Sequence, residues 1–279
     1  MDFSKFLIAT DLDGTFFADH SKLVQRNLDA IARFRAGGGM FTFSTGRVQL
    51  NVHKRIPHPE ALLSAPAVMC NGAYLYDFST HTALFEEFMP EKLTREVLTF
   101  ARERFPDVAF RVAAPDTLRI EGVTDPYIAK DVQGYLPESV RISPADTWQM
   151  NDWYKIVFRA DAVRNAEVRR MLEMRFAGAL TVIPSAPTIM EVQCPATNKA
   201  TGIEKLRRYL GERARTVITC GDFENDIPMH RAADVSIAPA NALPEVKALC
   251  DLVLCSNNEG VIADVIEAIE IGRITPKTV

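Results

Sequence analysis

Two carboxylates at the end of an apolar run constrain this chain more than any other feature. The run Phe6–Ala9 is typical of a buried strand, and Asp11 and Asp13 follow it closely. Side chains of an extended segment alternate between faces, so both aspartates point the same way, and Gly14 lets the backbone turn sharply beside them. Adjacent carboxylates repel each other unless a cation or a shared proton lies between them. On its own such a segment is also typical of a plain turn, so its meaning depends on the rest of the chain.

A second acidic cluster, Gly221–Asp226, follows another β-like apolar run, Thr216–Cys220. Both clusters come at the carboxyl ends of predicted strands, the edge where open parallel α/β sheets bind ligands. Hard oxygen donors with incomplete protein coordination suit Mg²⁺, which keeps waters and takes further ligands from a phosphorylated substrate. Calcium is disfavoured because the twelve-residue calcium-loop pattern is missing. The two clusters together predict a magnesium site at one sheet edge.

Two further segments would complete a phosphate site. Ser44–Arg47 follows the apolar run Met40–Phe43 and offers a hydroxyl, a permissive backbone at Gly46 and a guanidinium. Lys199 opens an amphipathic stretch and follows Asn198, a residue type that favours helix N-caps. We therefore expect a hydroxyl and an ammonium near the same edge as the carboxylates.

These segments, taken in order, resemble the haloacid dehalogenase superfamily of phosphotransferases, and specifically its Cof-type phosphatases, in which a large α/β cap is inserted into the core. Asp11–Thr15 looks like the first family motif, Thr45 like the second, Lys199 like the third and Gly221–Asp226 like the fourth. Asn71–Ala73 and Asn241–Ala242 match further recurrent segments of the branch. Four motifs in the expected order and strand context are far more specific than any one alone.

The resemblance implies a role for each residue. Asp11 would be the nucleophile that attacks phosphorus, and Asp13 would protonate the leaving group and then activate water. Thr45 and Lys199 would bind the transferring phosphoryl oxygens. Mg²⁺ would be held by Asp11, the backbone carbonyl of Asp13 and Asp222, supported directly or through water by Asn225 and Asp226. The implied substrate contacts are Thr45, Gly46, Arg47, Asn71, Lys199 and Asn225.

The implied activity is Mg²⁺-dependent hydrolysis of small phosphorylated metabolites, with sugar phosphates the leading class, through an aspartyl-phosphate. The alternatives are a phosphomutase of similar design and a non-catalytic regulatory or binding protein with the same fold. Plain structural roles also stay open: a helix cap for Thr45, a surface charge for Arg47, a solvated helix start for Lys199 and an Asn-Gly turn at Asn71.

Strand and helix patterns alternate along the chain, which predicts an α/β fold with a doubly wound, mostly parallel core sheet. The predicted core domain is discontinuous, residues 1–85 and 189–279, and includes Val68–Cys70 as a third strand. Residues 86–188 have their own strand and helix rhythm and are too long for a loop, so they predict an inserted α+β cap. Arg111, Arg119 and Lys155 in this insert are conceivable substrate contacts or ordinary surface charges.

Composition excludes several other classes. The chain has 279 residues, 47% of them hydrophobic, and a formal net charge of −4, which argues against a nucleic-acid face. Its five scattered cysteines favour reduced core residues, and its five histidines form no ligand pair by spacing. No apolar run reaches the roughly eighteen residues of a membrane helix, and no charged-then-apolar leader is present. These features predict a soluble cytoplasmic protein with a small-molecule ligand.

Overall fold

The structure is a computed structural model that describes residues 1–195, 197–213 and 215–276. The chain forms two units. Unit 1 comprises Met1–Gly46, His58–Phe85 and Asn198–Val279, and unit 2 comprises Arg47–Pro57 and Glu86–Thr197. Each unit has its own sheet and its own buried apolar cluster.

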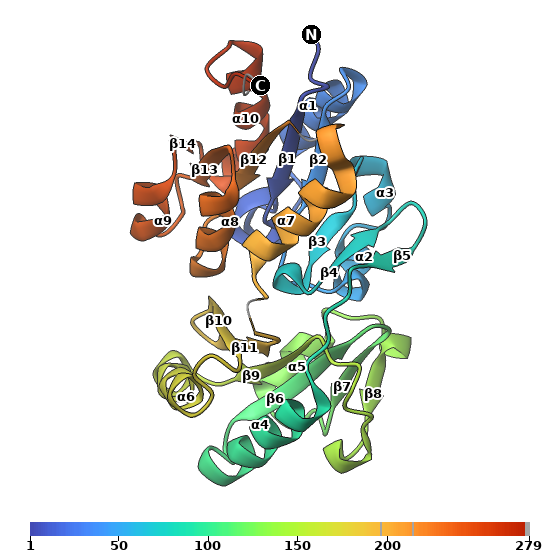
Figure 1. The fold of residues 1–279 in the computed structure, drawn as a ribbon, viewed down its shortest axis with the longest axis vertical. Coiled ribbons are helices and arrows are strands. Elements are labelled where there is room, and N and C mark those ends of the chain that lie inside the picture. The colour runs from blue at the N-terminus through green and yellow to red at the C-terminus, as the bar shows by residue number, and fades with distance from the viewer. Residues whose placement is uncertain (196, 214, 277–279) are drawn as a thin grey trace. The chain divides into compact units, whose positions relative to one another are not determined.

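Unit 1 is built on a five-stranded sheet in the order β14–β13–β12–β1–β2 (Figure 1). Every pairing in this sheet is parallel, so the carboxyl ends of the strands lie along one edge. The two central strands are buried along their whole length, which explains their near-continuous apolar sequences. The strand bounds are β1 Phe6–Thr10, β2 Met40–Phe43, β12 Thr216–Cys220, β13 Val235–Pro239 and β14 Leu252–Leu254.

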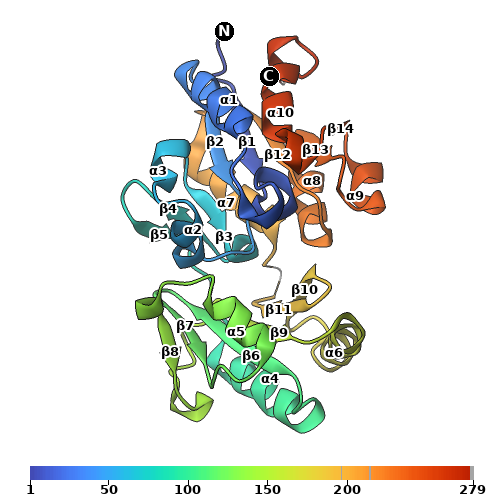
Figure 2. The ribbon, with the colours of Figure 1, turned by 180° about the vertical axis from the view of Figure 1, so that it is seen from behind.

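Helices cover both faces of this sheet, which confirms the predicted doubly wound core. Figures 1 and 2 show α7 and α8 on one face and α1 and α10 on the other. Ile203 and Leu206 of α7 pack against Leu7 and Val217 of the sheet, and burying each such side chain stabilises the fold by about 1.5–3 kcal/mol. The helix bounds are α1 Gln25–Ala36, α3 Pro59–Leu62, α7 Lys199–Leu210, α8 Ile227–Ala232, α9 Pro244–Leu249 and α10 Val261–Glu270.

The segment expected as a third core strand pairs mainly elsewhere. Strand β3 (Ala67–Met69) is antiparallel to β4 (Tyr74–Asp77), which is antiparallel to β5 (Thr82–Leu84). A single parallel bridge from Val68 to Ser44 joins β3 to the end of β2. Because only a short turn separates β3 from β4, antiparallel pairing of the two is available without a crossover helix.

Gly72 lies in this turn, beneath the start of α7. Its φ is +93°, and an added Cβ would stand 2.1 Å from the carbonyl oxygen of Asn198. Gly72→Ala is therefore expected to lower the free energy of unfolding by at least about 2 kcal/mol, measured by urea denaturation. Gly272→Ala is the matched control, because Gly272 has a φ of +73° with no described atom within 4 Å of its added Cβ. The control should lose only about 1 kcal/mol, and equal losses would show that the close approach is not the cause.

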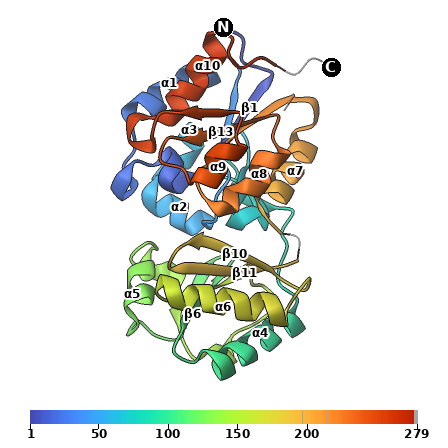
Figure 3. The ribbon, with the colours of Figure 1, turned by 90° about the vertical axis from the view of Figure 1, so that its left-hand side faces the viewer.

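Unit 2 contains a six-stranded sheet in the order β10–β11–β9–β6–β7–β8, antiparallel except between β7 and β8. Figure 3 shows α4 and α6 against one face of it. On that face Val112, Ile156 and Phe158 of the strands pack with Leu98 and Leu172 of the helices. The bounds are β6 Ala109–Ala114, β7 Thr117–Ile120, β8 Val140–Ile142, β9 Lys155–Arg159, β10 Thr181–Ala186, β11 Ile189–Gln193, α2 Gln49–Arg55, α4 Glu91–Arg104, α5 Pro126–Val132 and α6 Ala162–Arg175.

Unit 2 differs from the predicted insert in its borders. The predicted insert ends at residue 188, which leaves strand β11 in the core. In the structure β11 pairs with β9 and β10, because its Met190 and Val192 complete the apolar face of the unit 2 sheet. Helix α2 also belongs to unit 2, where Asn51 Nδ2 donates to the carbonyl of Gly134 at 2.7 Å. The division into a core and a cap remains a prediction.

Candidate functional site at the edge of the parallel sheet

Distant chain segments meet at the carboxyl edge of the unit 1 sheet because their backbones hydrogen-bond to one another. The N–H of Asp11 donates to the carbonyl of Cys220 at 2.8 Å, which joins the end of β1 to the end of β12. The N–H of Thr45 donates to the carbonyl of Val68, and the N–H of Asn71 donates to the carbonyl of Thr45, both at 2.9 Å. The residues that follow these strands therefore lie side by side.

Lys199 is fully buried at the first position of α7. Its Nζ donates to Oδ1 of Asp11 at 2.6 Å and to Oδ1 of Asp226 at 2.5 Å. Asn198 caps the helix as predicted, its side chain accepting two backbone N–H groups of the first turn. Burial opposes the charge of Lys199, but the two carboxylates outweigh it and raise the pKa above its ordinary value. A buried ammonium therefore stands between the two acidic clusters.

Asp226 holds the loop that follows β12. Its Oδ2 accepts the backbone N–H groups of Asp222 and Phe223, at 2.8 Å and 3.0 Å. Since its Oδ1 accepts from Lys199, both oxygens of Asp226 are engaged. The contacts fix Asp222 relative to Lys199.

Asp222 interlocks with the first acidic segment. Its Oδ1 accepts a hydrogen bond from the hydroxyl of Thr15 at 2.6 Å. Gly14, with φ +76°, comes so close that an added Cβ would stand 2.4 Å from Oδ2 of Asp222. The position of Asp222 therefore leaves no room for a side chain at residue 14, and its carboxylate accepts a hydrogen bond from the hydroxyl at residue 15.

Thr15 and Asn241 are site residues that sequence reasoning missed. Asn241 Nδ2 donates to the carbonyl of Gly14 at 2.8 Å, and the N–H of Asn257 donates to Oδ1 of Asn241 at 2.9 Å. The signal for Thr15 was its place in the first motif, and that for Asn241 its place in a recurrent segment. Thr15 thus contacts a carboxylate of the cluster, and Asn241 holds the loop after β1.

Three carboxylates gather at this edge. Asp11, Asp222 and Asp226 each offer an oxygen, and these oxygens lie within 4.8 Å of one another. Burial raises the pKa of Asp11 to about 7, and burial with the charges of Asp226 and Asp11 raises the pKa of Asp222 to about 8. Among the residues that the structure describes, the ammonium of Lys199 contacts two of the three carboxylates. The excess negative charge and the hard oxygen donors fit a divalent cation such as Mg²⁺.

Asp13 differs from Asp11 in its surroundings. Asp11 is 7% exposed, whereas Asp13 is exposed to solvent two residues further along an extended backbone (φ −83°, ψ 125°). An exposed carboxyl can exchange protons with water, and a buried one held by an ammonium is fixed in place. The two aspartates therefore have environments suited to different roles.

The remaining predicted residues divide between the units. Asn225 Nδ2 donates to Oδ1 of the buried Asn71 at 3.2 Å, and Gly46 packs beside the same amide. Thr45 is buried at the end of β2. Arg47 belongs to unit 2, where its guanidinium donates to the side chain of Asn51, and its contact with substrate stays a prediction.

The structure also bears on the predicted exclusions. No helix in the described residues is both long and apolar enough to cross a membrane. All five cysteines are free thiols. His230 is buried, its Nδ1 lies 3.0 Å from the hydroxyl of Thr219, and burial lowers its pKa. His230 is therefore a packed interior residue, as expected for a histidine that forms no ligand pair by spacing.

Comparison with known proteins gives one family along nearly the whole chain. A family model described as haloacid dehalogenase-like hydrolase matches residues 8–266. Pyridoxal phosphate phosphatase YbhA of Escherichia coli (strain K12) is 28% identical over 276 residues, which cover 93% of this chain and 97% of the relative. The 5-amino-6-(5-phospho-D-ribitylamino)uracil phosphatase YcsE of Bacillus subtilis (strain 168) is 26% identical over 263 residues, covering 93% and 94% of the two chains.

A solved structure shares the fold. The structure of a HAD/COF-like hydrolase from Plasmodium vivax aligns with a TM-score of 0.84 and 23% sequence identity, over 96% of each chain. The alignment includes residues of both units.

Proposed function

Because the chain belongs to the family of haloacid dehalogenase-like hydrolases, we propose that it is an Mg²⁺-dependent phosphatase of small phosphorylated metabolites. The observation that carries the proposal is the buried Lys199 bonded to Asp11, with Asp222 beside them at the edge of the parallel sheet. Relatives named for pyridoxal phosphate and for a phosphorylated ribitylaminouracil support small phosphate monoesters as the substrate class. Sugar phosphates remain the leading group within it.

Asp11 would be the nucleophile. Its Oδ1 accepts from Lys199, which fixes the orientation of the carboxylate. Its Oδ2 would attack phosphorus, a P–O bond to the aspartate would form, and the ester oxygen would leave in line. The resulting aspartyl-phosphate would then be hydrolysed to free phosphate and restored Asp11.

Asp13 would be the general acid and base. In the first step it would give its proton to the departing ester oxygen, and in the second it would take a proton from the attacking water. Its solvent exposure suits this exchange, whereas Asp11 is enclosed. The assignment divides the two motif aspartates by environment.

The phosphoryl oxygens would be bound by Lys199 and Thr45. The Lys199 ammonium would offset charge that spreads over these oxygens in the transition state, and the Thr45 hydroxyl would donate to one of them. Asn71 and Gly46, which pack together at the end of β2, are proposed as contacts to the phosphate edge. Asn225 would support the same edge through its bond to Asn71.

Mg²⁺ would be held by carboxylate oxygens of Asp11 and Asp222 and by the backbone carbonyl of Asp13. Both oxygens of Asp226 are engaged by Lys199 and by backbone N–H groups, which favours a supporting role for Asp226. When bound, the cation would supply positive charge to the phosphoryl group and neutralise the excess of carboxylates.

Unit 2 is proposed as the inserted cap that sets substrate choice, and a cytoplasmic location stays a prediction. The discontinuous unit 1 contains each of the proposed catalytic and metal-binding residues, so unit 2 is left to select among esters. Substrate preference should therefore change with substitutions in unit 2 more readily than the chemical step does.

Phosphate release from a panel of esters tests the proposal. The panel would contain sugar phosphates, pyridoxal phosphate, flavin mononucleotide and nucleotides, each with Mg²⁺ or with EDTA. We expect release with Mg²⁺ from one or more sugar phosphates, near-complete loss with EDTA, and recovery when Mg²⁺ is restored. Release that is unchanged by chelation would contradict the metal assignment.

The same panel separates the two alternatives. A phosphomutase would return the phosphoryl group to the sugar, so little free phosphate would appear and a bisphosphate activator would be required. A non-catalytic protein would release phosphate from none of the esters, with or without Mg²⁺. Either result would overturn the phosphatase assignment.

A further inference from the structure

Unit 2 carries buried positive charge on the face of its sheet opposite α4 and α6. Neighbouring residues of a strand point to opposite faces, so Arg111 of β6 and Arg159 of β9 lie away from the apolar Val112 and Phe158. Arg111 is 8% exposed and Arg159 is 5% exposed. Surface charge, one expectation from sequence, is therefore wrong for Arg111, and also for Lys155, which is 2% exposed.

The two arginines share one carboxylate. Asp131 Oδ2 of α5 accepts from Nε of Arg111 at 2.6 Å and forms an ion pair with Nε of Arg159 at 3.2 Å. One negative charge cannot neutralise two guanidinium groups. Burial is the main cause that lowers the pKa of Arg159, and the charge of Arg111 adds to it.

Much of the hydrogen-bonding capacity of Arg111 is not used. A guanidinium offers five N–H donors. Within the described residues, Asp131 is the one hydrogen-bond acceptor for Arg111, and Nη1 of Arg111 is buried with no acceptor. Arg159 donates Nη1 to the carbonyl of Thr188 at 2.9 Å. Because a buried donor without an acceptor costs about 1–3 kcal/mol, this arrangement favours an additional acceptor.

Neighbouring aromatic rings hold the arginines in place. The guanidinium carbons of Arg111 and Arg159 lie 6.0 Å and 5.4 Å from the ring centres of Tyr135 and Tyr127. The other facing charges are committed: Lys155 pairs with Glu191 at 2.5 Å, and the side chain of Asp125 caps α5. The arginine pair is thus oriented, and Asp131 is the carboxylate that contacts both guanidinium groups.

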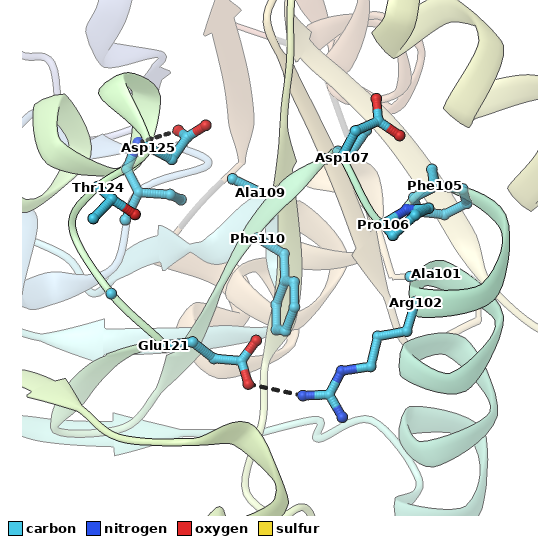
Figure 4. Close-up of a pocket in the computed structure, with 13 residues that line it drawn as sticks. Ala101, Arg102, Phe105, Pro106, Asp107, Ala109, Phe110, Glu121, Thr124 and Asp125 are labelled. Atoms are coloured by element: carbon cyan, nitrogen blue, oxygen red, sulfur yellow. Dashed lines mark hydrogen bonds and ion pairs between the residues drawn. The ribbon is translucent and has the colours of Figure 1, made fainter.

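Two other arginines of unit 2 each pair with one carboxylate. Arg119 donates to both oxygens of Asp152, at 2.9 Å and 2.6 Å. A cavity of about 600 Å³ lies between α4, β6 and the β7–α5 connection, and Figure 4 shows Arg102 bonded to Glu121 on its wall. Arg111 and Arg159 differ from these pairs because they share the single carboxylate of Asp131.

We propose that Arg111 and Arg159 form an oxyanion-binding site within unit 2 that takes the carboxylate or phosphate group of a small metabolite. Planar guanidinium groups bind such anions through paired N–H···O bonds. An anion here accepts from the unused donors of Arg111, among them the buried Nη1. Its residues belong to unit 2, whereas the residues proposed for the chemical step belong to unit 1.

Calorimetric titration of the full chain with inorganic phosphate and with succinate, both in EDTA, tests the site. Arg111→Met leaves Arg159 and Asp131 as a one-to-one pair, so we expect a folded protein whose Arg111-dependent anion affinity falls at least about tenfold. Arg111→Lys keeps the charge without the planar fork and should lose less. Arg119→Met, in a balanced pair of the same unit, should bind both anions like the unaltered chain.

A kinetic measurement distinguishes the two sources of the anion. If the anion belongs to the ester itself, Arg111→Lys lowers kcat/KM for esters that carry a second phosphate or a carboxylate. It leaves kcat/KM unchanged for phosphate esters whose alcohol part is uncharged. If it is a separate metabolite, binding alone changes. Either result supports the site, whereas equal binding of both probes by the unaltered chain, Arg111→Met and Arg111→Lys overturns it. The titration does not depend on turnover, so its failure is distinct from failure of the proposed phosphatase activity.

Discussion

Asp11→Asn is expected to lower kcat for phosphate release by at least about 10⁴-fold, because an amide cannot replace the attacking carboxylate. The fold should persist, since Asn is nearly isosteric and Lys199 keeps its 2.5 Å contact with Asp226. Steady-state release of phosphate, with circular dichroism of the same sample, is the measurement. Asp29→Asn makes the same chemical change at an exposed position of α1 and should leave kcat unaltered.

The same variant has a predictable effect on stability without metal. Burial raises the pKa of Asp11 from 3.8 to about 7. Below about pH 4 the carboxyl is protonated in both the folded and unfolded states, and between about pH 4 and 7 it ionises first in the unfolded state, which lowers the stability of the unaltered chain. In EDTA, the Tm of Asp11→Asn should therefore rise relative to the unaltered chain across this window. A Tm difference between Asp11→Asn and the unaltered chain that shrinks with rising pH would contradict the cost of burying an ionised Asp11. A kcat of Asp11→Asn near that of the unaltered chain would contradict the role of Asp11 as nucleophile.

Lys199→Met should damage both folding and activity. It leaves the carboxylates of Asp11 and Asp226 buried without their ammonium, and removing one partner of a buried ion pair costs about 3–5 kcal/mol. It also removes the positive charge that would meet the phosphoryl oxygens, so we expect loss of turnover as well. Urea denaturation at pH 8 and phosphate release measure the two effects.

Two further variants separate charge from packing in this prediction. Lys205→Met lies on the same helix, where Nζ of Lys205 donates to the carbonyl of Gly72, and should cost only about 1 kcal/mol. Adding Asp226→Asn to Lys199→Met removes one of the stranded carboxylates and should recover part of the lost stability without recovering turnover. A Lys199→Met protein that unfolds within 1 kcal/mol of the unaltered chain would rule out the buried ion pair as the main effect.

The core sheet and its edge were predictable because both follow from local sequence. Phe6–Thr10 and Thr216–Cys220 are apolar on both faces, as strands inside a parallel sheet must be, and polar residues begin where each strand ends. Chain order and strand context were therefore enough to predict that Asp11, Lys199 and Asp222 meet at one edge. The catalytic roles themselves remain to be tested.

Other features depend on partners far away in sequence, so no local pattern could reveal them. The apolar face of β11 fits either sheet, and only its pairing with β9 and β10 places it in unit 2. Helix α2 is held in unit 2 by the carbonyl of Gly134, 83 positions from Asn51. The sequence left Arg111 open between a substrate contact and a surface charge, because its partner Asp131 lies on another element, α5.

The order of strands in unit 1 affects how this protein folds during its synthesis on the ribosome. Strand β1 is made well before β12, which is one of its two neighbours, with Phe6 opposite Thr216. Lys199 and Asp11 are likewise 188 positions apart. The long loop between β1 and β12 must close before these strands can pair, so the parallel core assembles late. The strands of unit 2, by contrast, are complete before β12 has been synthesised. Until then the apolar faces and the open edge of β1 are exposed to other chains, and the nascent protein is most vulnerable to misassembly in that interval.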